Sequence, residues 1–256
     1  MSWRDRFAAR GSALCVGLDP VPERIPQGLS VAEFCCDVID ASAEYAACFK
    51  PNIAFFERCG EVERDGLPKV LAAARERRVP VILDAKRGDV PSTSRAYAET
   101  YFGGRLDVDA LTVSPFCGLD GVAPFAQRAR ELDRGVFLLL RTSNPGAEAL
   151  QAPVEKVLVE AIRSDAVFGA VVGATDPETG ARLRAALPDT LFLVPGFGAQ
   201  GGDDLKPFFR EGAGAVVNSS RGILYAGEGR RRSEWKDAVR EAARVAHETI
   251  ERARKG

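Results

Sequence analysis

The sequence predicts an α/β protein in which eight parallel strands close into a (β/α)8 barrel, a TIM barrel, as a single domain over residues 1–256. Three observations predict this fold. Short apolar runs alternate eight times with helix-like segments, and the spacing between runs is about the length of one βα unit. The chain of 256 residues also has the usual size of such a barrel, without a linker or low-complexity tract that would divide it.

The predicted strands are short runs of apolar and β-branched residues, each bounded by glycine, proline or charge. Because most runs are continuous rather than alternating in polarity, they indicate strands that are covered on both faces, as in a parallel sheet. The runs are Leu14–Leu18, Ala46–Lys50, Val79–Asp84, Val108–Ser114, Val136–Arg141, Val167–Gly173, Leu191–Pro195 and Ala215–Asn218.

The segments between these runs have the apolar spacing of helices that cover a sheet. They are Val31–Glu44, Pro68–Arg77, Ser92–Thr100, Gly121–Leu132, Ala147–Arg163, Pro177–Leu187, Asp203–Arg210 and Ser233–Arg254. A doubly wound open sheet is the alternative fold, because alternation alone does not show closure. No Gly-x-Gly-x-x-Gly follows the first strand, which weakens a dinucleotide-binding version of that fold.

Composition excludes several classes of partner. With 35 Lys and Arg against 36 Asp and Glu, the formal net charge of −1 gives no general attraction to nucleic acid or to an anionic membrane. No stretch reaches the ~20 apolar residues of a membrane span, and the first residues have no apolar leader segment. Six cysteines without CxxC spacing, and one histidine, make a poor zinc set. We therefore expect a cytoplasmic protein with reduced thiols and no metal.

The third predicted strand ends in an unusual charged segment. Asp84 and Lys86 stand two residues apart, so on an extended strand they point to the same side, and Lys50 ends the neighbouring strand. Asp89 follows on a turn. A structural ion pair before a capped helix is the ordinary explanation of such a pattern. It is weakened here because two lysines and two aspartates converge on the end of a barrel where active sites form.

This charge pattern suits the removal of a carboxylate. At about 4 Å and an effective dielectric near 20, each contact between like charges costs about 4 kcal/mol. A substrate carboxylate beside the aspartates would be repelled, and its loss as CO2 relieves that repulsion. Lys86 could then stabilise the carbanion and protonate it, because lysine carries a transferable proton whereas arginine effectively does not.

Two later segments predict a phosphate site. The seventh unit reads Pro195-Gly196-Phe197-Gly198-Ala199-Gln200-Gly201-Gly202, and its four glycines let backbone N–H groups approach an anion, with Asp203 opening a helix. The eighth strand ends in Asn218-Ser219-Ser220-Arg221-Gly222, which adds hydroxyl groups and a guanidinium. Loops after strands seven and eight are the usual phosphate site of such barrels, so a mononucleotide or a sugar phosphate fits.

These motifs resemble the orotidine 5′-phosphate decarboxylase family over nearly the whole chain. Asp84-Ala85-Lys86-Arg87-Gly88-Asp89-Val90 with Thr93 is similar to its Asp-x-Lys-x-x-Asp signature, with Val90 where isoleucine is commoner. The segment from Pro195 to Gly202 is similar to its phosphate loop. Three further segments resemble the longer bacterial subgroup, namely Cys15–Pro20, Phe49–Asn52 and Arg141–Gly146.

The resemblance implies an activity and a role for each site residue. Such an enzyme converts orotidine 5′-monophosphate to UMP and CO2 in pyrimidine biosynthesis, without a metal or organic cofactor, as a homodimer with a shared active site. Lys86 would be the proton donor between Asp84 and Asp89 of the partner subunit, with Lys50 completing the array. The implied substrate-binding residues are Asp19, Lys50 and the partner's Thr93 for the ribose, Ser143 for the pyrimidine, and Pro195, Gln200, Gly201, Gly202, Ser220 and Arg221 around the phosphate.

Two other functions are also compatible with the sequence. A 3-keto-L-gulonate 6-phosphate decarboxylase or a hexulose phosphate synthase has a similar barrel and uses Mg2+ held by acidic groups. A carboxylate at the end of the second strand would favour it, but Lys50 stands there. The chain could also be a nucleotide-binding barrel without catalysis, although four buried charges are costly to keep for binding alone.

Overall fold

The eight strands form one parallel sheet in the order β2-β1-β8-β7-β6-β5-β4-β3. The computed structural model describes residues 2–60, 66–198, 202, 204–210 and 214–256. The strands are β1 Leu14–Leu18, β2 Cys48–Pro51, β3 Ile82–Arg87, β4 Ala110–Val113, β5 Gly135–Arg141, β6 Phe168–Val172, β7 Phe192–Val194 and β8 Ala215–Ser219. Parallel bridges from Phe49 to Val81 and from Asn52 to Asp84 join the two ends of the sheet. The predicted barrel is therefore confirmed, and the open sheet is excluded.

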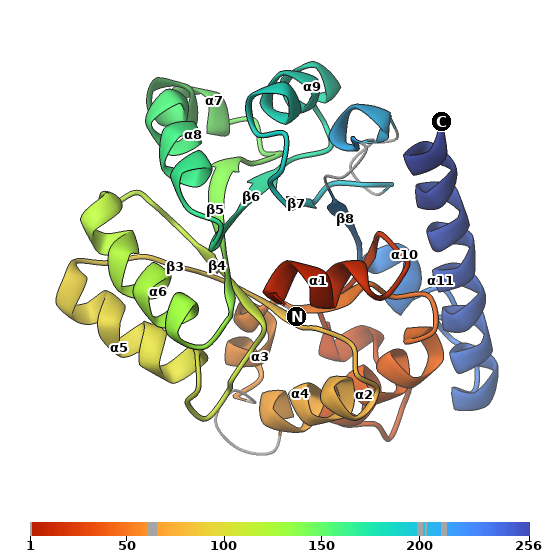
Figure 1. The fold of residues 1–256 in the computed structure, drawn as a ribbon. Helices are drawn as coiled ribbons and strands as arrows, with labels where there is room; N and C mark the ends of the chain where they lie inside the picture. Colours follow the sequence, from red (N-terminus) through yellow and green to blue (C-terminus); the bar gives the residue numbers. More distant parts are fainter. Residues whose placement is uncertain (1, 61–65, 199–201, 203, 211–213) are drawn as a thin grey trace.

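Helices surround the sheet on its outer face (Figure 1). The α-helices are α1 Trp3–Ala8, α2 Val31–Ser42, α3 Ile53–Arg58, α4 Gly66–Glu76, α5 Pro91–Tyr101, α6 Leu119–Glu131, α7 Ala147–Gln151, α8 Glu155–Ser164, α9 Pro177–Ala186, α10 Arg221–Leu224 and α11 Arg232–Lys255. Among the described residues, three short 3-10 helices occur, η1 Pro22–Arg24, η2 Ala152–Val154 and η3 Lys206–Phe208. Within the described ranges, no helix combines the length and the apolar character needed to cross a membrane.

Two predicted helices differ from the structure, and a proline explains each difference. The segment predicted as one helix over Ala147–Arg163 is divided into α7, η2 and α8, because Pro153 lacks the N–H group that a continuous helix needs there. The helix predicted over Asp203–Arg210 is wrong for its described residues, which contain only the short η3. Pro207 stands in the interior of that predicted helix, and Asp203 itself lies outside the described residues.

The end of the barrel where the strands begin is filled by α1, which the sequence did not reveal. Trp3 and Phe7 are buried there, with the Trp3 ring 5.7 Å from that of Phe137 and 6.0 Å from that of Phe7. The Trp3 ring lies so close to Gly135 that a Cβ at that position would come within 2.5 Å of it. Figure 1 views the barrel from this end, with α1 across the opening.

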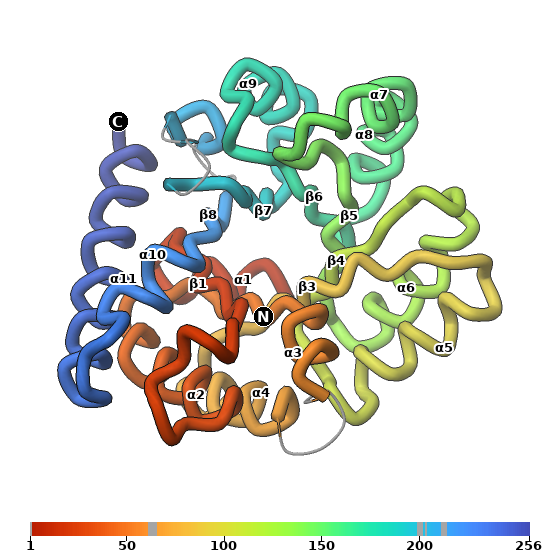
Figure 2. Tube along the Cα trace, turned by 180° about the vertical axis from the view of Figure 1, so that it is seen from behind, coloured from red at the N-terminus to blue at the C-terminus, as the bar shows by residue number. Residues whose placement is uncertain are grey.

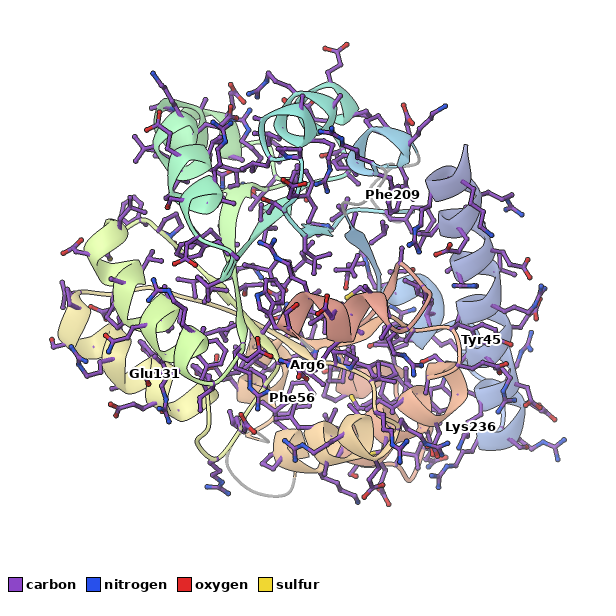
Figure 3. All side chains as sticks on the ribbon, in the orientation of Figure 1. Arg6, Tyr45, Phe56, Glu131, Phe209 and Lys236 are labelled. Carbon is purple, nitrogen blue, oxygen red and sulfur yellow. The ribbon has the colours of Figure 1, made fainter. Side chains whose placement is uncertain are left out.

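Local capping explains why so short a helix forms. Ser2 Oγ accepts the N–H of Asp5 at 3.3 Å, and Asp5 Oδ2 accepts the N–H of Ser2 at 2.8 Å, a reciprocal capping box. Arg6 then pairs with Asp133 at 2.7 Å, before β5. In Figure 3, Arg6 lies toward the middle of this end of the barrel. Capping, ion pairing and aromatic packing together hold α1 across the barrel.

Candidate active site

Three charged side chains meet at the end of the barrel where the strands finish. Figure 2 shows the backbone from this end. Lys50 of β2 places Nζ 2.9 Å from Asp84 Oδ2, and Lys86 of β3 places Nζ 2.6 Å from Asp84 Oδ1. The side chains of Lys50 and Asp84 are 5% and 11% exposed, whereas that of Lys86 is 49% exposed. Asp84 therefore bridges a buried lysine and a lysine that faces the opening, and we call these three residues the ion array.

The charges of the ion array stabilise one another. Burial raises the pKa of Asp84, but the ammonium groups of Lys50 and Lys86 outweigh burial and hold that pKa well below its usual range. Burial lowers the pKa of Lys50, but the carboxylates of Asp84 and Asp19 outweigh it and raise that pKa above its usual range. The Lys50–Asp84 pair is thus fully ionised at neutral pH. Buried ion pairs contribute little to stability, so this pair indicates a chemical use.

The backbone around Lys86 is irregular. Leu83 pairs with Leu111 and Arg87 pairs with Val113, so the register between β3 and β4 shifts between these two pairs. Lys86 itself has a φ of 47°, in the left-handed region. The hydroxyl of Thr112 bonds to this irregular segment. Thr112 is not among the residues predicted from the sequence, where its signal is a polar residue within a buried apolar strand.

Asp19 is held beside the ion array by residues that follow β8. Ser220 Oγ donates to Asp19 Oδ2 at 2.5 Å. The Tyr225 hydroxyl donates to the Asp19 carbonyl at 2.9 Å and accepts the N–H of Val21 at 2.8 Å. Asp19 Oδ1 is buried and has no hydrogen-bond partner among the described residues. This atom can therefore accept a hydroxyl group of a bound molecule. Tyr225 is a second supporting residue that sequence analysis did not single out.

The described parts of the predicted phosphate loop have backbone conformations that require glycine. Gly196 and Gly198 have φ values of 102° and 71°, which other residues rarely adopt. The N–H of Gly202 donates to the Gly196 carbonyl at 3.3 Å, which draws the two ends of the loop together. Pro195 directly follows β7. Gln200 and Gly201 lie outside the described residues.

The remaining predicted residues also follow strand ends. Ser220 directly follows β8, and Arg221 begins α10 with an exposed side chain. Ser143 lies half-buried two residues after β5. Asp89 Oδ1 accepts the N–H of Val90 at 2.7 Å, and Thr93 is exposed in the first turn of α5. In the described part of the chain, no ion pair joins Asp89 to Lys86.

No group of three or more His, Cys, Asp or Glu side chains that could hold a metal ion occurs among the residues that the structure describes. Asp84, the carboxylate of the ion array, already contacts two ammonium groups. These two positive charges would repel a divalent cation at the same position. The described site therefore does not fit the Mg2+-dependent alternative.

Together the fold and the site define a (β/α)8-barrel enzyme with a charged centre at the carboxyl ends of its strands. The family model described as "Orotidine 5'-phosphate decarboxylase / HUMPS family" matches residues 12–236. The chain belongs to this family.

Similar proteins agree with this assignment. The chain is 44% identical over 268 residues to the orotidine 5'-phosphate decarboxylase of Haloarcula marismortui, covering 93% of this chain and 92% of the relative. It is 43% identical over 240 residues to that of Deinococcus radiodurans, covering 87% of each. The structure of Leishmania donovani OMP decarboxylase superposes with a TM-score of 0.81, at 35% identity, covering 100% of both chains.

Proposed function

We propose that this protein is a carboxy-lyase that converts orotidine 5′-monophosphate to UMP and CO2 in pyrimidine biosynthesis, as a single catalytic domain without a cofactor. The observation that carries the proposal is the ion array, in which Asp84 lies between the ammonium groups of Lys50 and Lys86. Family membership and relatives at about 40% identity support the same reaction.

In the proposed chemistry, Asp84 and Lys86 of the ion array have different roles. A substrate carboxylate beside Asp84 meets a like charge, which at about 4 Å costs about 4 kcal/mol. The C6–carboxylate bond breaks, CO2 leaves, and the bonding electron pair stays on C6 beside the Lys86 ammonium. Lys86 Nζ then donates a proton to C6, which completes UMP. Because the Lys86 side chain is 49% exposed, it regains a proton from water.

The remaining predicted residues hold the substrate in place. Asp19 Oδ1 accepts a ribose hydroxyl, which would satisfy a buried oxygen that lacks a partner. Ser220 and Arg221 bind the phosphate together with Pro195, Gln200, Gly201 and Gly202. Ser143 contacts the pyrimidine. In this arrangement binding energy from the phosphate positions the C6 carboxylate against the ion array.

The protein works as a homodimer in this proposal, with a second copy supplying Asp89 and Thr93 to each site. Large apolar side chains are exposed at Val90, next to Asp89, and at Phe116 and Leu119, between β4 and the start of α6, which packs against the Asp89 backbone at Gly121. Val90, Phe116 and Leu119 are 54%, 84% and 41% exposed. Exposed apolar side chains gathered beside polar site residues are typical of an interface. A second copy that covers this surface would bring its Asp89 toward Lys86.

Mixing two inactive variants tests the shared site. Lys86→Ala and Asp89→Ala proteins are mixed under conditions in which dimers exchange subunits. If Asp89 acts across the interface, each mixed dimer regains one intact site, so the mixture reaches about a quarter of wild-type activity. If Asp89 acts within its own chain, no site is restored, and activity stays at the level of the separate variants.

A chelator-treated assay tests the reaction itself. Purified protein is incubated with excess EDTA, and the loss of orotidine 5′-monophosphate absorbance is followed. We expect full turnover, because the ion array supplies the charges that a divalent ion would otherwise supply. Absent turnover, or turnover that returns only with Mg2+, would contradict the proposal.

We place the reaction in the cytoplasm, since no disulfide joins any of the six cysteines, all of which lie in described segments.

A further inference from the structure

The hydroxyl group of Thr112 makes three hydrogen bonds at the base of the ion array. Oγ1 accepts the backbone N–H groups of Ala85 and Lys86 at 3.0 and 2.9 Å. The same hydroxyl donates to Asp84 Oδ1 at 3.1 Å. A hydroxyl group has one donor and two acceptor sites, so these bonds saturate it. Thr112 is 1% exposed, so water does not compete for these positions.

The strand register explains why the backbone needs this hydroxyl group. Between the pairs Leu83–Leu111 and Arg87–Val113, three residues of β3 face only Thr112 on β4. A regular ladder cannot supply acceptors for the extra N–H groups of such a bulge. Buried N–H groups without an acceptor are strongly unfavourable. The Thr112 side chain takes the place of the missing backbone acceptor.

The same hydroxyl group fixes the two ends of the Asp84–Lys86 contact. Lys86 has a φ of 47°, a conformation that persists only where the surroundings hold it. Thr112 Oγ1 accepts the backbone N–H of Lys86 and donates to Asp84 Oδ1. Asp84 Oδ1 is also the atom that contacts Lys86 Nζ, at 2.6 Å. One buried oxygen atom therefore sets the position of the ammonium group relative to its carboxylate.

We propose that Thr112 is a positioning residue for the decarboxylation, which acts through Asp84 and Lys86 and touches no reacting atom. Its hydroxyl group keeps Lys86 Nζ where the C6 carbanion forms, and keeps Asp84 Oδ1 directed at the site that the substrate carboxylate enters. This inference rests on the proposed function, in which Lys86 donates the proton.

Thr112→Val is the direct test, because valine keeps the shape of threonine and lacks the hydroxyl group. We expect kcat to fall about ten- to a hundredfold, the effect of losing a hydrogen bond to a charged group, and KM to change less than about threefold. KM is spared because Asp19 and the residues that bind phosphate follow β1, β7 and β8, and Thr112 on β4 bonds to none of them. Thr112→Ser retains the hydroxyl group and is expected to recover most of kcat.

Thr190→Val is the matched control. Thr190 is also buried, but it precedes β7 at the opposite end of the barrel. The same chemical change there is expected to leave kcat and KM unchanged. An equal loss of kcat in Thr112→Val and Thr190→Val would show a general effect of removing a buried hydroxyl group, and would overturn the proposal.

The other outcomes also decide the question. A wild-type kcat in Thr112→Val, or an equal loss in Thr112→Val and Thr112→Ser, overturns the positioning role. If Thr112→Val does not fold, kcat is measured in Thr112→Cys, whose thiol hydrogen-bonds weakly. A wild-type kcat there overturns the role, and a reduced kcat supports it. A wild-type protein that does not decarboxylate the substrate overturns the proposed function instead.

Discussion

The interior of the barrel is filled by opposite kinds of side chain at its two ends. Where the strands begin, Trp3 and Phe7 close the interior and pack against Phe137. Where the strands finish, Lys50 and Asp84 place a buried ion pair in the same interior. Apolar packing stabilises a fold efficiently, whereas a buried ion pair costs about as much in desolvation as it gains. Stability and chemistry are therefore assigned to separate ends of the barrel.

The largest effect should follow from removing the Lys86 ammonium group. In Lys86→Ala we expect kcat to fall by about a thousandfold or more, because both the proton donor and its charge are lost. UMP binding should change little, since the phosphate and ribose contacts remain. Absorbance assays and UMP titration measure the two quantities. Lys236→Ala, which removes a lysine of α11 paired with Asp37 of α2, away from the ion array, is the control and should keep full turnover.

A variant that retains most of its turnover would remove Lys86 from the reaction. It would also weaken the contrast between the two ends, because the charged end would then have no demonstrated chemical use.

Trp3→Ala should have the next largest effect, on stability alone. Truncating a buried tryptophan leaves a cavity and typically costs about 3–5 kcal/mol in the free energy of unfolding. Because Trp3 lies at the opposite end from the ion array, kcat of the folded variant at 25 °C should equal that of wild type. Urea denaturation and steady-state kinetics measure the two quantities. A tenfold loss of kcat in folded protein would show that the two ends are coupled.

Arg221→Ala should have a moderate effect on binding. Loss of a guanidinium contact to phosphate is expected to raise KM about a hundredfold for the nucleotide. The slow reaction of orotidine, which lacks the phosphate, should be unchanged. Arg231→Ala is a suitable control, because that arginine is exposed and pairs with Glu234. Equal losses for the phosphorylated and unphosphorylated substrates would exclude a phosphate-binding role for Arg221.

The smallest expected effect is that of pH on the stability supplied by Asp84. Its pKa in the folded protein is depressed, so its contribution is present above the ordinary value of 3.8 and is lost as pH falls toward the folded pKa. The difference in free energy of unfolding between wild type and Asp84→Asn should therefore vary by no more than about 0.5 kcal/mol between pH 5 and 7, within the error of extrapolation. It should shrink below about pH 4. A steady rise from pH 5 to 7 would contradict a depressed pKa.

The sequence predicted the barrel well because most strands are continuous apolar runs, which differ from the spaced apolar residues of the helices between them. It did less well where a single residue decides the outcome. Pro153 divides one predicted helix and Pro207 removes another, since both lack an N–H group. Helix α1 was missed because six residues are too few for a periodic pattern. Its packing depends on Phe137, a partner far along the chain.

The charged residues of the candidate site could be predicted because they stand at the ends of strands. The residue that depends on backbone geometry could not be predicted. Lys50, Asp84 and Lys86 stand at positions that a barrel brings together. The shifted register that makes Thr112 important is invisible in the sequence, because a threonine in a buried strand is ordinarily a β-branched packing residue. The role of Asp89 depends on a second copy, and it stays a prediction.

Helix α1 has a consequence for how the protein is synthesised. The Trp3 N–H donates to Asp133 and its indole Nε1 donates to Ala166, residues 130 and 163 positions further along the chain. These two contacts of α1 therefore cannot form until residues 133 and 166 have been synthesised. Contacts of such long range form late and slow the folding of a chain. Trp3 fluorescence should report the closing step of folding, after most of the sheet has assembled.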